Sequence, residues 1–277
     1  MVVTLKEILK IAEARKIAVG SFNTPNLTSL KAVLDAAEAL DQPVILMHAQ
    51  IHEEIGLCKM DEIAPIMLFM ADRAKVPVCV HLDHGTDLDY IARGLKLGFT
   101  SVMYDGSTLG REMNFANTAV TVGLARKYGA SVEAEIGSMG AREGGDGGSD
   151  ESIYTDPDDA KLFADETGID ALACAFGTAH GLYLKKPKLD FARLEKIDSL
   201  VDIPLVMHGG SGVSVEDYRR VIDLGIRKIN YYTYMAKAGG AAAMACPDKT
   251  FFHDIEVAAM KGMQTDVENA IRVFSGL

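Results

Sequence analysis

Five of the seven histidines stand at or just beyond the ends of short apolar runs that are typical of buried strands: His48, His81, His84, His180 and His208. A strand histidine taken singly is more often a hydrogen-bonded core residue than a ligand. Histidines from separate strands can converge at one edge, however, and three imidazoles with an open fourth position form a catalytic zinc site. We therefore predict that His84, His180 and His208 bind zinc.

The remaining histidines have weaker claims. His81 lies deeper in its run than His84, so we expect it to support the ligands rather than bind the metal. His48 fits either a site residue or a packed core residue. The patterns around His52 and His253 indicate no role for them.

Carboxylates accompany the predicted ligands. Asp83 precedes His84, Asp105 follows one apolar run, and Glu133 and Glu135 lie late in another. A carboxylate held beside a reacting group can take up a proton and later return it. The pattern favours proton transfer next to a metal ion.

A glycine-rich run directly follows His208 and reads Gly209-Gly-Ser-Gly212. Glycines let backbone N–H groups approach an anion, Ser211 adds a hydroxyl, and a predicted helix follows with its positive end toward the run. The run taken alone also fits a simple tight turn. Its place beside His208 favours a phosphate site.

These side chains need a scaffold that brings strand ends together. The apolar runs predict eight strands: Ile17–Phe22, Pro43–His48, Pro77–Leu82, Phe99–Tyr104, Ser131–Ile136, Ala171–Phe176, Pro204–His208 and Lys228–Tyr232. Their first residues lie 22 to 40 residues apart, the length of a strand-and-helix unit. Eight such units predict an α/β fold, a single (β/α)8 TIM barrel over residues 1–277, whose functional groups gather at the carboxyl ends of the strands.

Helical patterns fill the gaps between these strands. The clearest are Thr28–Leu40, Asp87–Leu95, Glu112–Tyr128, Asp158–Thr167 and Val215–Leu224. We also expect a short N-terminal helix, Leu5–Ala14, and a C-terminal helical extension from Phe251. The glycine-rich segment Gly137–Asp150 cannot hold a packed element and is predicted to be a flexible loop.

Composition and charge argue against several partners. The formal net charge is -11, and an acidic surface repels nucleic-acid backbones. No apolar run approaches the roughly 18–20 residues that cross a bilayer. The four cysteines are widely spaced and the first residues resemble no signal peptide. We therefore expect a cytoplasmic protein with neither a nucleic-acid nor a membrane partner.

Four segments carry a resemblance that extends over nearly the whole chain: His81-Leu-Asp-His-Gly85, Val132-Glu-Ala-Glu-Ile-Gly137, Phe176-Gly-Thr-Ala-His-Gly181 and Met207-His-Gly-Gly-Ser-Gly212. In order and spacing they resemble the class II, metal-dependent ketose-bisphosphate aldolases. The resemblance implies that His84, His180 and His208 bind the catalytic Zn²⁺. It further implies that Asp83 is the acid/base at the C4 hydroxyl and that Glu143, on the glycine-rich loop, carries a second proton.

The same resemblance implies the rest of the site. Acidic residues near the metal are matched by Glu135 and Asp105. The positions that hold the phosphate of dihydroxyacetone phosphate are matched by Gly181, Gly209, Ser211, Asn230 and Thr233. Asn23, which follows the first strand, is a further candidate substrate residue. A monovalent cation, Na⁺ or K⁺, is expected near the phosphate, and the chain is expected to form a homodimer or homotetramer.

The function so implied is reversible cleavage of a ketose 1,6-bisphosphate to dihydroxyacetone phosphate and glyceraldehyde 3-phosphate. Fructose 1,6-bisphosphate is favoured over tagatose 1,6-bisphosphate. Another ketose phosphate or a deoxy-keto sugar acid phosphate is an alternative substrate. A zinc hydrolase is an alternative function, ranked lower because the glycine-rich phosphate run and the placement of Asp83 beside a ligand favour the aldolase. A non-catalytic barrel subunit is ranked last because the ligand set is complete.

Three departures from the family pattern affect the far end of the substrate. Ala49 replaces a common serine, and Ala236 stands where some family members carry an arginine for the distal phosphate. The segment after the last-strand asparagine, which usually carries Asp or small residues, reads Asn230-Tyr-Tyr-Thr-Tyr234. Because the predicted strand runs to Tyr232, that side chain should share the face of Asn230. We therefore expect weaker reliance on a distal phosphate, unless an arginine such as Arg272 of a neighbouring subunit restores it.

Overall fold

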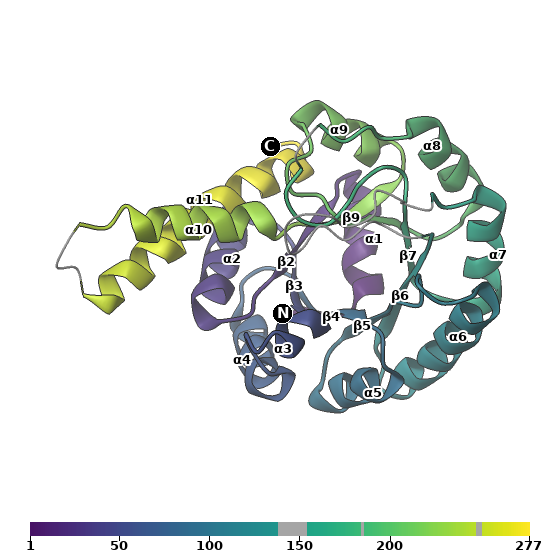
Figure 1. Cartoon of the computed structure of the whole chain (residues 1–277), viewed down its shortest axis with the longest axis horizontal. Coiled ribbons are helices and arrows are strands. Elements are labelled where there is room, and N and C mark those ends of the chain that lie inside the picture. Colours follow the sequence, from purple (N-terminus) through teal and green to yellow (C-terminus); the bar gives the residue numbers. More distant parts are fainter. Residues whose placement is uncertain (138–153, 184–185, 248–250) are drawn as a thin grey trace.

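The computed structural model describes residues 1–137, 154–183, 186–247 and 251–277. Eight parallel strands form a closed barrel in chain order, and the first of them, β2, pairs with the last, β9 (Figure 1). The barrel strands are β2 (Val19–Asn23), β3 (Val44–Ala49), β4 (Val78–Gly85), β5 (Ser101–Tyr104), β6 (Ser131–Ile136), β7 (Ala171–Cys174), β8 (Leu205–Met207) and β9 (Ile226–Asn230). The predicted (β/α)8 TIM barrel is confirmed.

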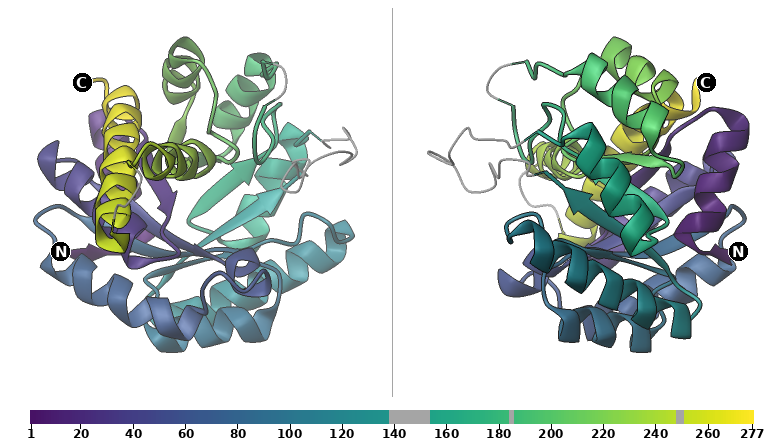
Figure 2. Two further views of the ribbon diagram at one scale, coloured as in Figure 1. Left: turned by 60° about the vertical axis from the view of Figure 1, so that its left-hand side comes forward. Right: turned by 90° about the vertical axis from the view of Figure 1, so that its right-hand side faces the viewer.

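The helices lie between the strands or after the last of them in the sequence, and most of them surround the barrel, as two further views show (Figure 2). They are α1 (Leu5–Arg15), α2 (Leu27–Ala39), α3 (Gln50–Glu54), α4 (Met60–Arg73), α5 (Leu88–Leu97), α6 (Arg111–Lys127), α7 (Pro157–Thr167), α8 (Phe191–Leu200), α9 (Val215–Asp223), α10 (Thr233–Met244) and α11 (Phe252–Ser275). No helix of the described residues is both long enough and apolar enough to cross a membrane.

The amino-terminal helix α1 packs against the inside of the barrel. Thr4 caps it, accepting a hydrogen bond from the backbone N–H of Glu7. Its buried residues, Leu5, Ile8, Leu9 and Ala12, share an apolar cluster with residues such as Cys79 and Val206 of the strands. Figure 1 shows α1 within the outline of the ring of strands. The backbone N–H of Lys6 donates to Oγ of Ser131, the first residue of β6, so α1 lies at the amino ends of the strands, opposite the expected site.

Strand alternation separates the two layers of packing. In β4, Val80 and Leu82 belong to the cluster beneath the outer helices, whereas Cys79 belongs to the cluster inside the barrel. Because side chains alternate along a strand, His81 and Asp83 share the inward face with Cys79. These polar side chains of β4 therefore point into the barrel.

The end of the last strand differs from the prediction. Strand β9 stops at Asn230, Tyr232 occupies the N-cap position of α10, and Thr233 is the first residue of that helix. The expectation that the strand continues to Tyr232 is therefore wrong, so strand alternation does not place this side chain, although Tyr232 and Asn230 do line one cavity. The chain leaves the sheet two residues earlier, because Tyr231 turns into an aromatic cluster with Phe22 and Phe274.

Helices α10 and α11 pack against each other and project from the barrel (Figure 1). The expected C-terminal extension is confirmed as α11, whose buried Ile271 and Phe274 attach it to the barrel. The backbone N–H of Ala18, just before β2, donates to the carbonyl of Phe274. A β-bridge also joins β1 (Val2–Val3) to β4.

Candidate active site

A cavity of about 340 Å³ opens among the carboxyl ends of the strands. Residues from β2, β4, β6 and β9 and from the loops after β5, β7 and β8 line it. Of the predicted site residues, these line the cavity: Asn23, Asp83, His84, Asp105, Glu135, His180, Gly181, Gly209, Ser211, Asn230 and Thr233. His208 lies directly below, fully buried. Glu143 lies outside the described residues.

The three predicted ligands meet at this end of the barrel. One ligand atom of each of His84, His180 and His208 lies within 4.8 Å of the others. The ring nitrogens His84 Nε2, His180 Nε2 and His208 Nδ1 are buried and have no hydrogen-bond partner among the described residues. Three unpartnered imidazole nitrogens that face one another fit a tetrahedral Zn²⁺ with an open position. The donor set thus matches the metal that the resemblance implies.

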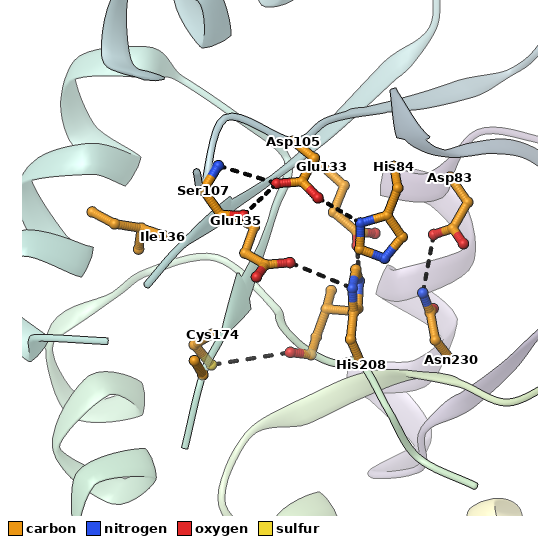
Figure 3. Close-up of polar contacts among 12 residues, drawn as sticks. Asp83, His84, Asp105, Ser107, Glu133, Glu135, Ile136, Cys174, His208 and Asn230 are labelled. Atoms are coloured by element: carbon orange, nitrogen blue, oxygen red, sulfur yellow. Dashed lines mark hydrogen bonds and ion pairs between the residues drawn. The ribbon is translucent and has the colours of Figure 1, made fainter. Parts of the chain in front are cut away.

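Carboxylates hold two of these rings from behind (Figure 3). Nδ1 of His84 lies 2.7 Å from Oδ2 of Asp105, and Nε2 of His208 lies 2.7 Å from Oε1 of Glu133. A carboxylate accepts a hydrogen bond from the N–H of the ring nitrogen it faces, which leaves the other nitrogen of a neutral ring as a lone-pair donor. The two contacts therefore select the ring tautomers that a metal requires.

Burial sets the charge of the ligands. It lowers the pKa of His180 to about 3, so this ring is neutral at pH 7, as a ligand must be. Burial also disfavours a charged His84, but Asp83 and Asp105 outweigh it and raise the pKa of His84 to about 10. To hold a metal ion, His84 would have to give up this proton.

His84 reaches the cavity through a distortion of β4. Strict alternation would turn His84 away from its inward neighbour Asp83. The backbone of His84 adopts a φ of 48°, and the β4–β5 register shifts between Leu82 and Gly85. A left-handed backbone at a non-glycine residue is uncommon and marks a local constraint. It lets two consecutive side chains face one cavity.

Asp83 is oriented by two asparagines. Nδ2 of Asn230 donates to its Oδ1 over 3.0 Å, and Nδ2 of Asn23 lies 3.5 Å from its Oδ2. Burial opposes the charge of this carboxylate, but His84 and Lys228 outweigh it and lower the pKa of Asp83 to about 2. Asp83 is consequently an ionised carboxylate at neutral pH, able to accept a proton.

A buried ion pair lies beneath the histidines. Nζ of Lys228 is 2.9 Å from Oε2 of Glu133, and both side chains have no exposed surface. Burial raises the pKa of Glu133, yet Lys228 and the hydrogen bond from His208 reverse this and hold it well below its usual range. Glu133 is therefore a fixed negative charge behind His208.

Asp105 and Glu135 offer a second grouping. Together with His84 they form another set whose ligand atoms lie within 4.8 Å of one another. Asp105 already accepts from Ser107 Oγ over 2.6 Å and faces His84 Nδ1, so it supports the His84 ring in this arrangement. Glu135 Oε2 is 3.5 Å from His208 Nδ1, close to the three-histidine cluster.

The opposite wall suits a phosphate. Gly209 and Ser211 line it, and Ser211 Oγ accepts from the backbone N–H of Tyr232 over 3.2 Å, which leaves the hydroxyl proton to donate elsewhere. Helix α10 begins here at Thr233; its N-cap residue Tyr232 makes no side-chain capping hydrogen bond, and the backbone N–H of Tyr234 donates to Ser211 Oγ over 3.5 Å. Free N–H groups at a helix start attract anions. The sequence indicated the glycines but not the start of α10.

A family model described as fructose-bisphosphate aldolase class-II matches residues 3–276. The chain belongs to this family. A crystal structure of the YdjI aldolase from Escherichia coli K12 superposes with a TM-score of 0.89 at 33% identity, over 99% of this chain and 97% of that one. A fructose-bisphosphate aldolase from Campylobacter jejuni has a TM-score of 0.80 at 24% identity, over 99% and 95% of the two chains, and supports the fold.

Membership of the class II aldolase family confirms the resemblance drawn from the four motifs. Family members are lyases that act on phosphorylated sugars, and they typically depend on a metal ion. The histidine cluster is where such an ion fits in this chain.

Sequence reasoning passed over two residues of this aldolase site. His52 lines the cavity, with its ring 5.2 Å from that of Tyr232. It lies on the short helix α3, whose position beside the cavity no periodicity revealed. The sequence pattern places Lys228 in a predicted strand without indicating a role for it, although a lysine in a buried strand is itself a signal of function. His81, by contrast, lies below the cluster as expected, 2.8 Å from Oγ of Ser101.

Proposed function

We propose that this aldolase uses Zn²⁺ to cleave the C3–C4 bond of a ketose 1,6-bisphosphate reversibly, releasing dihydroxyacetone phosphate and glyceraldehyde 3-phosphate. Fructose 1,6-bisphosphate is the favoured substrate and tagatose 1,6-bisphosphate the second. The observation that carries the proposal is the carboxylate of Asp83, which lines the cavity beside a cluster of three histidines whose ligand atoms lie within 4.8 Å of one another.

Each residue of the site has its own role in the proposed reaction. Asp83 takes the proton of the C4 hydroxyl, which lets the aldehyde leave, and Asn230 and Asn23 hold its carboxylate in place. Gly181, Gly209, Ser211 and Thr233 hold the phosphate next to C1. A bound zinc ion would supply Lewis-acid stabilisation of the charge that develops on the ketose oxygen. Glu143 is proposed to return a proton to C3.

Two further assignments complete the proposed site. Asp105 and Glu135 act near the metal, the first by orienting His84. A monovalent cation, Na⁺ or K⁺, is proposed beside the substrate phosphate, as the resemblance implies.

The metal requirement is tested directly. Purified protein should hold about one zinc per chain, and a chelator should abolish the release of dihydroxyacetone phosphate. His180→Ala should lose the metal, because three protein ligands are the minimum for a catalytic zinc site. Full activity in chelator, or covalent trapping of substrate by borohydride, would show that the proposed chemistry is wrong.

A ketose phosphate without a distal phosphate is a second candidate substrate. Among the described residues, those that line the cavity include no lysine or arginine, while Glu54 does line it. His52 and Tyr232 form part of the wall and offer hydrogen bonds rather than charge. A phenol or neutral imidazole binds a phosphate dianion less strongly than a bidentate arginine does.

Comparing kcat/KM for fructose 1,6-bisphosphate, tagatose 1,6-bisphosphate and fructose 1-phosphate decides between the candidates. If the distal phosphate contributes little, the kcat/KM values for fructose 1,6-bisphosphate and fructose 1-phosphate should differ by less than about tenfold. A preference of roughly 10³ or more for the bisphosphate corresponds to a charged contact of about 4 kcal/mol. That result would reject the second candidate and point to an arginine from elsewhere, such as Arg272 of a neighbouring subunit.

Two accompanying proposals concern the cellular form of the enzyme. All four cysteines are free thiols, which supports a reducing, cytoplasmic compartment. We also propose that residues 1–277 act as one domain and assemble into a homodimer or homotetramer, which light scattering of the purified protein would test.

A further inference from the structure

Lys228 lies in the barrel interior beneath the cavity and is not among the residues that line it. Its side chain has no exposed surface. Burying an ammonium group is costly unless it is fully hydrogen-bonded, so its contacts indicate what it does. One contact connects Lys228 to a metal ligand, and the other connects it to the proton acceptor of the proposed reaction.

The first contact leads to the metal ligands. Nζ of Lys228 lies 2.9 and 3.2 Å from the two carboxylate oxygens of Glu133. The Oε1 atom of Glu133 faces His208 Nε2 at 2.7 Å, and Figure 3 shows the two side chains in contact. The ammonium thus pins the carboxylate that in turn fixes the tautomer and the direction of the His208 ring.

The second contact leads to Asp83. Nζ of Lys228 donates to Oδ1 of Asn230 over 2.7 Å, and Nδ2 of Asn230 donates to Oδ1 of Asp83 over 3.0 Å. An amide has an acceptor on one side and donors on the other. With an ammonium on one side and a carboxylate on the other, only one amide orientation satisfies both. Lys228 therefore decides that Asn230 presents its N–H to Asp83.

We propose that Lys228 is a positioning residue that couples the metal ligand His208 to the proton acceptor Asp83. It acts through Glu133 on one side and through Asn230 on the other. It touches neither substrate nor metal, and its pairing with Glu133 below the cavity makes it a poor Schiff-base nucleophile. This coupling holds the metal ligand His208 and the base Asp83 in fixed positions relative to each other.

The test replaces Lys228 by methionine, which keeps the length of the side chain and removes the charge. Affinity for zinc, measured by competition with a chromophoric chelator, should fall about 10- to 100-fold, as when a ligand's supporting partner is removed. At saturating zinc, carbon–carbon cleavage should fall at least about tenfold. Proton exchange at C1 of dihydroxyacetone phosphate, which does not use Asp83, should fall much less. Lys6→Met, at an exposed ion pair with Asp170, is the matched control and should change none of the three.

A double variant, Lys228→Met with Glu133→Gln, guards against misfolding, because it leaves no unpaired charge buried. Its rate of cleavage at saturating zinc should remain at least about tenfold below that of the native enzyme, since Lys228 no longer holds the amide of Asn230 in place. A native rate of cleavage in this variant would show that Lys228 only balances the charge of Glu133, and it would overturn the proposal. Equal losses of cleavage and exchange would assign a general structural role and overturn it too, as would failure of both variants to fold.

The coupling to Asp83 rests on the proposed aldolase function, and the experiment separates the two failures. If the native protein releases no dihydroxyacetone phosphate from any ketose phosphate tested, the proposed function is wrong. The zinc affinities of native protein and Lys228→Met still test the contact through Glu133 in that case. Unchanged zinc affinity together with unchanged cleavage overturns the role of Lys228 while leaving the aldolase proposal intact.

Discussion

At the scale of single residues, the site is governed by which groups are charged when buried. Asp83 is ionised because nearby positive groups outweigh the cost of its burial, and His180 is neutral because burial and the neighbouring His84 outweigh the carboxylates of Asp83 and Asp105. A base and a metal ligand need these two opposite states. Both arise from the same barrel interior.

Replacing Asp83 by alanine should separate metal binding from catalysis. The variant should hold zinc as native protein does, because Asp83 is not in the three-histidine cluster. Cleavage should fall by about 10²–10⁴, the usual effect of losing a general acid/base. Metal content and the rate of dihydroxyacetone phosphate release check the two parts. Loss of zinc from this variant would contradict the assigned role.

Glu143→Ala provides the companion measurement. If Glu143 carries the second proton, this variant should slow isotope loss from C1 of dihydroxyacetone phosphate when no aldehyde is present. The expected reduction is also about 10²–10⁴. Exchange at the native rate would show that Glu143 is not the proton carrier.

The depressed pKa of Asp83 also predicts a change of stability with pH. An acid whose pKa is lower in the folded state than in the unfolded state stabilises the fold above its unfolded pKa, and this contribution is lost as pH falls. For Asp83 the window runs from about 4, the unfolded value, to about 2. In metal-free protein, the contribution lost is about 2 kcal/mol.

Urea unfolding of metal-free native protein and of Asp83→Asn measures this effect. The difference in unfolding free energy between them should be constant from pH 7 to about pH 5 and should change in the destabilising direction for native protein below about pH 4. A difference that stays constant down to about pH 2.5 would mean that Asp83 is not stabilised as a charge.

At the scale of elements, the site depends on close packing between the loops after β7 and β8. Gly209 has a φ of 62°, and a Cβ there would lie 2.3 Å from the carbonyl oxygen of Ala179, the neighbour of His180. Only glycine combines this backbone with this approach. The loop that carries His180 is therefore positioned by the residue that follows His208.

Gly209→Ala should accordingly displace His180. We expect the affinity for zinc to fall at least about tenfold, because the position of a ligand is disturbed, and the rate of cleavage to fall with it. Gly123→Ala is the matched control, because a Cβ at this position in α6 meets nothing within 4 Å. It should leave zinc affinity unchanged and raise stability by about 0.5–1 kcal/mol. Native zinc affinity in Gly209→Ala would show that the loops adjust independently.

At the scale of the whole molecule, stability and chemistry occupy opposite ends of the barrel. The helix α1 fills the amino end with apolar side chains, while the carboxyl ends of the strands hold the histidines and carboxylates. This is the usual division in TIM barrels, since loops after the strands vary without disturbing the packed end.

Leu9→Ala should therefore destabilise the protein without affecting the site. Leu9 is fully buried, and such a truncation costs about 2–5 kcal/mol. Leu162→Ala, at a residue of α7 that is 40% exposed, should cost less than about 0.5 kcal/mol. Chemical denaturation measures both, and zinc affinity of the folded variants should match that of native protein. A loss of zinc affinity in folded Leu9→Ala would show that the two ends are coupled.

The sequence by itself determined the barrel and the general place of the site. Apolar runs separated by helical patterns predict eight parallel strands, and the carboxyl ends of such strands meet at one rim. His84, His180 and His208 could therefore be grouped although about a hundred residues separate the first two. Both inferences need only the periodicity of each segment and the direction of the chain.

Tertiary structure decided what depends on contacts between segments. The left-handed backbone of His84, with the shift between β4 and β5, brings two consecutive side chains to one cavity. Tyr231 packs against Phe22 and Phe274, so the last strand ends early and α10 starts at the phosphate wall. Lys228 acquires its partner Glu133 from a strand almost a hundred residues away. Local patterns cannot encode such features, because register and packing are set by the neighbours that folding supplies.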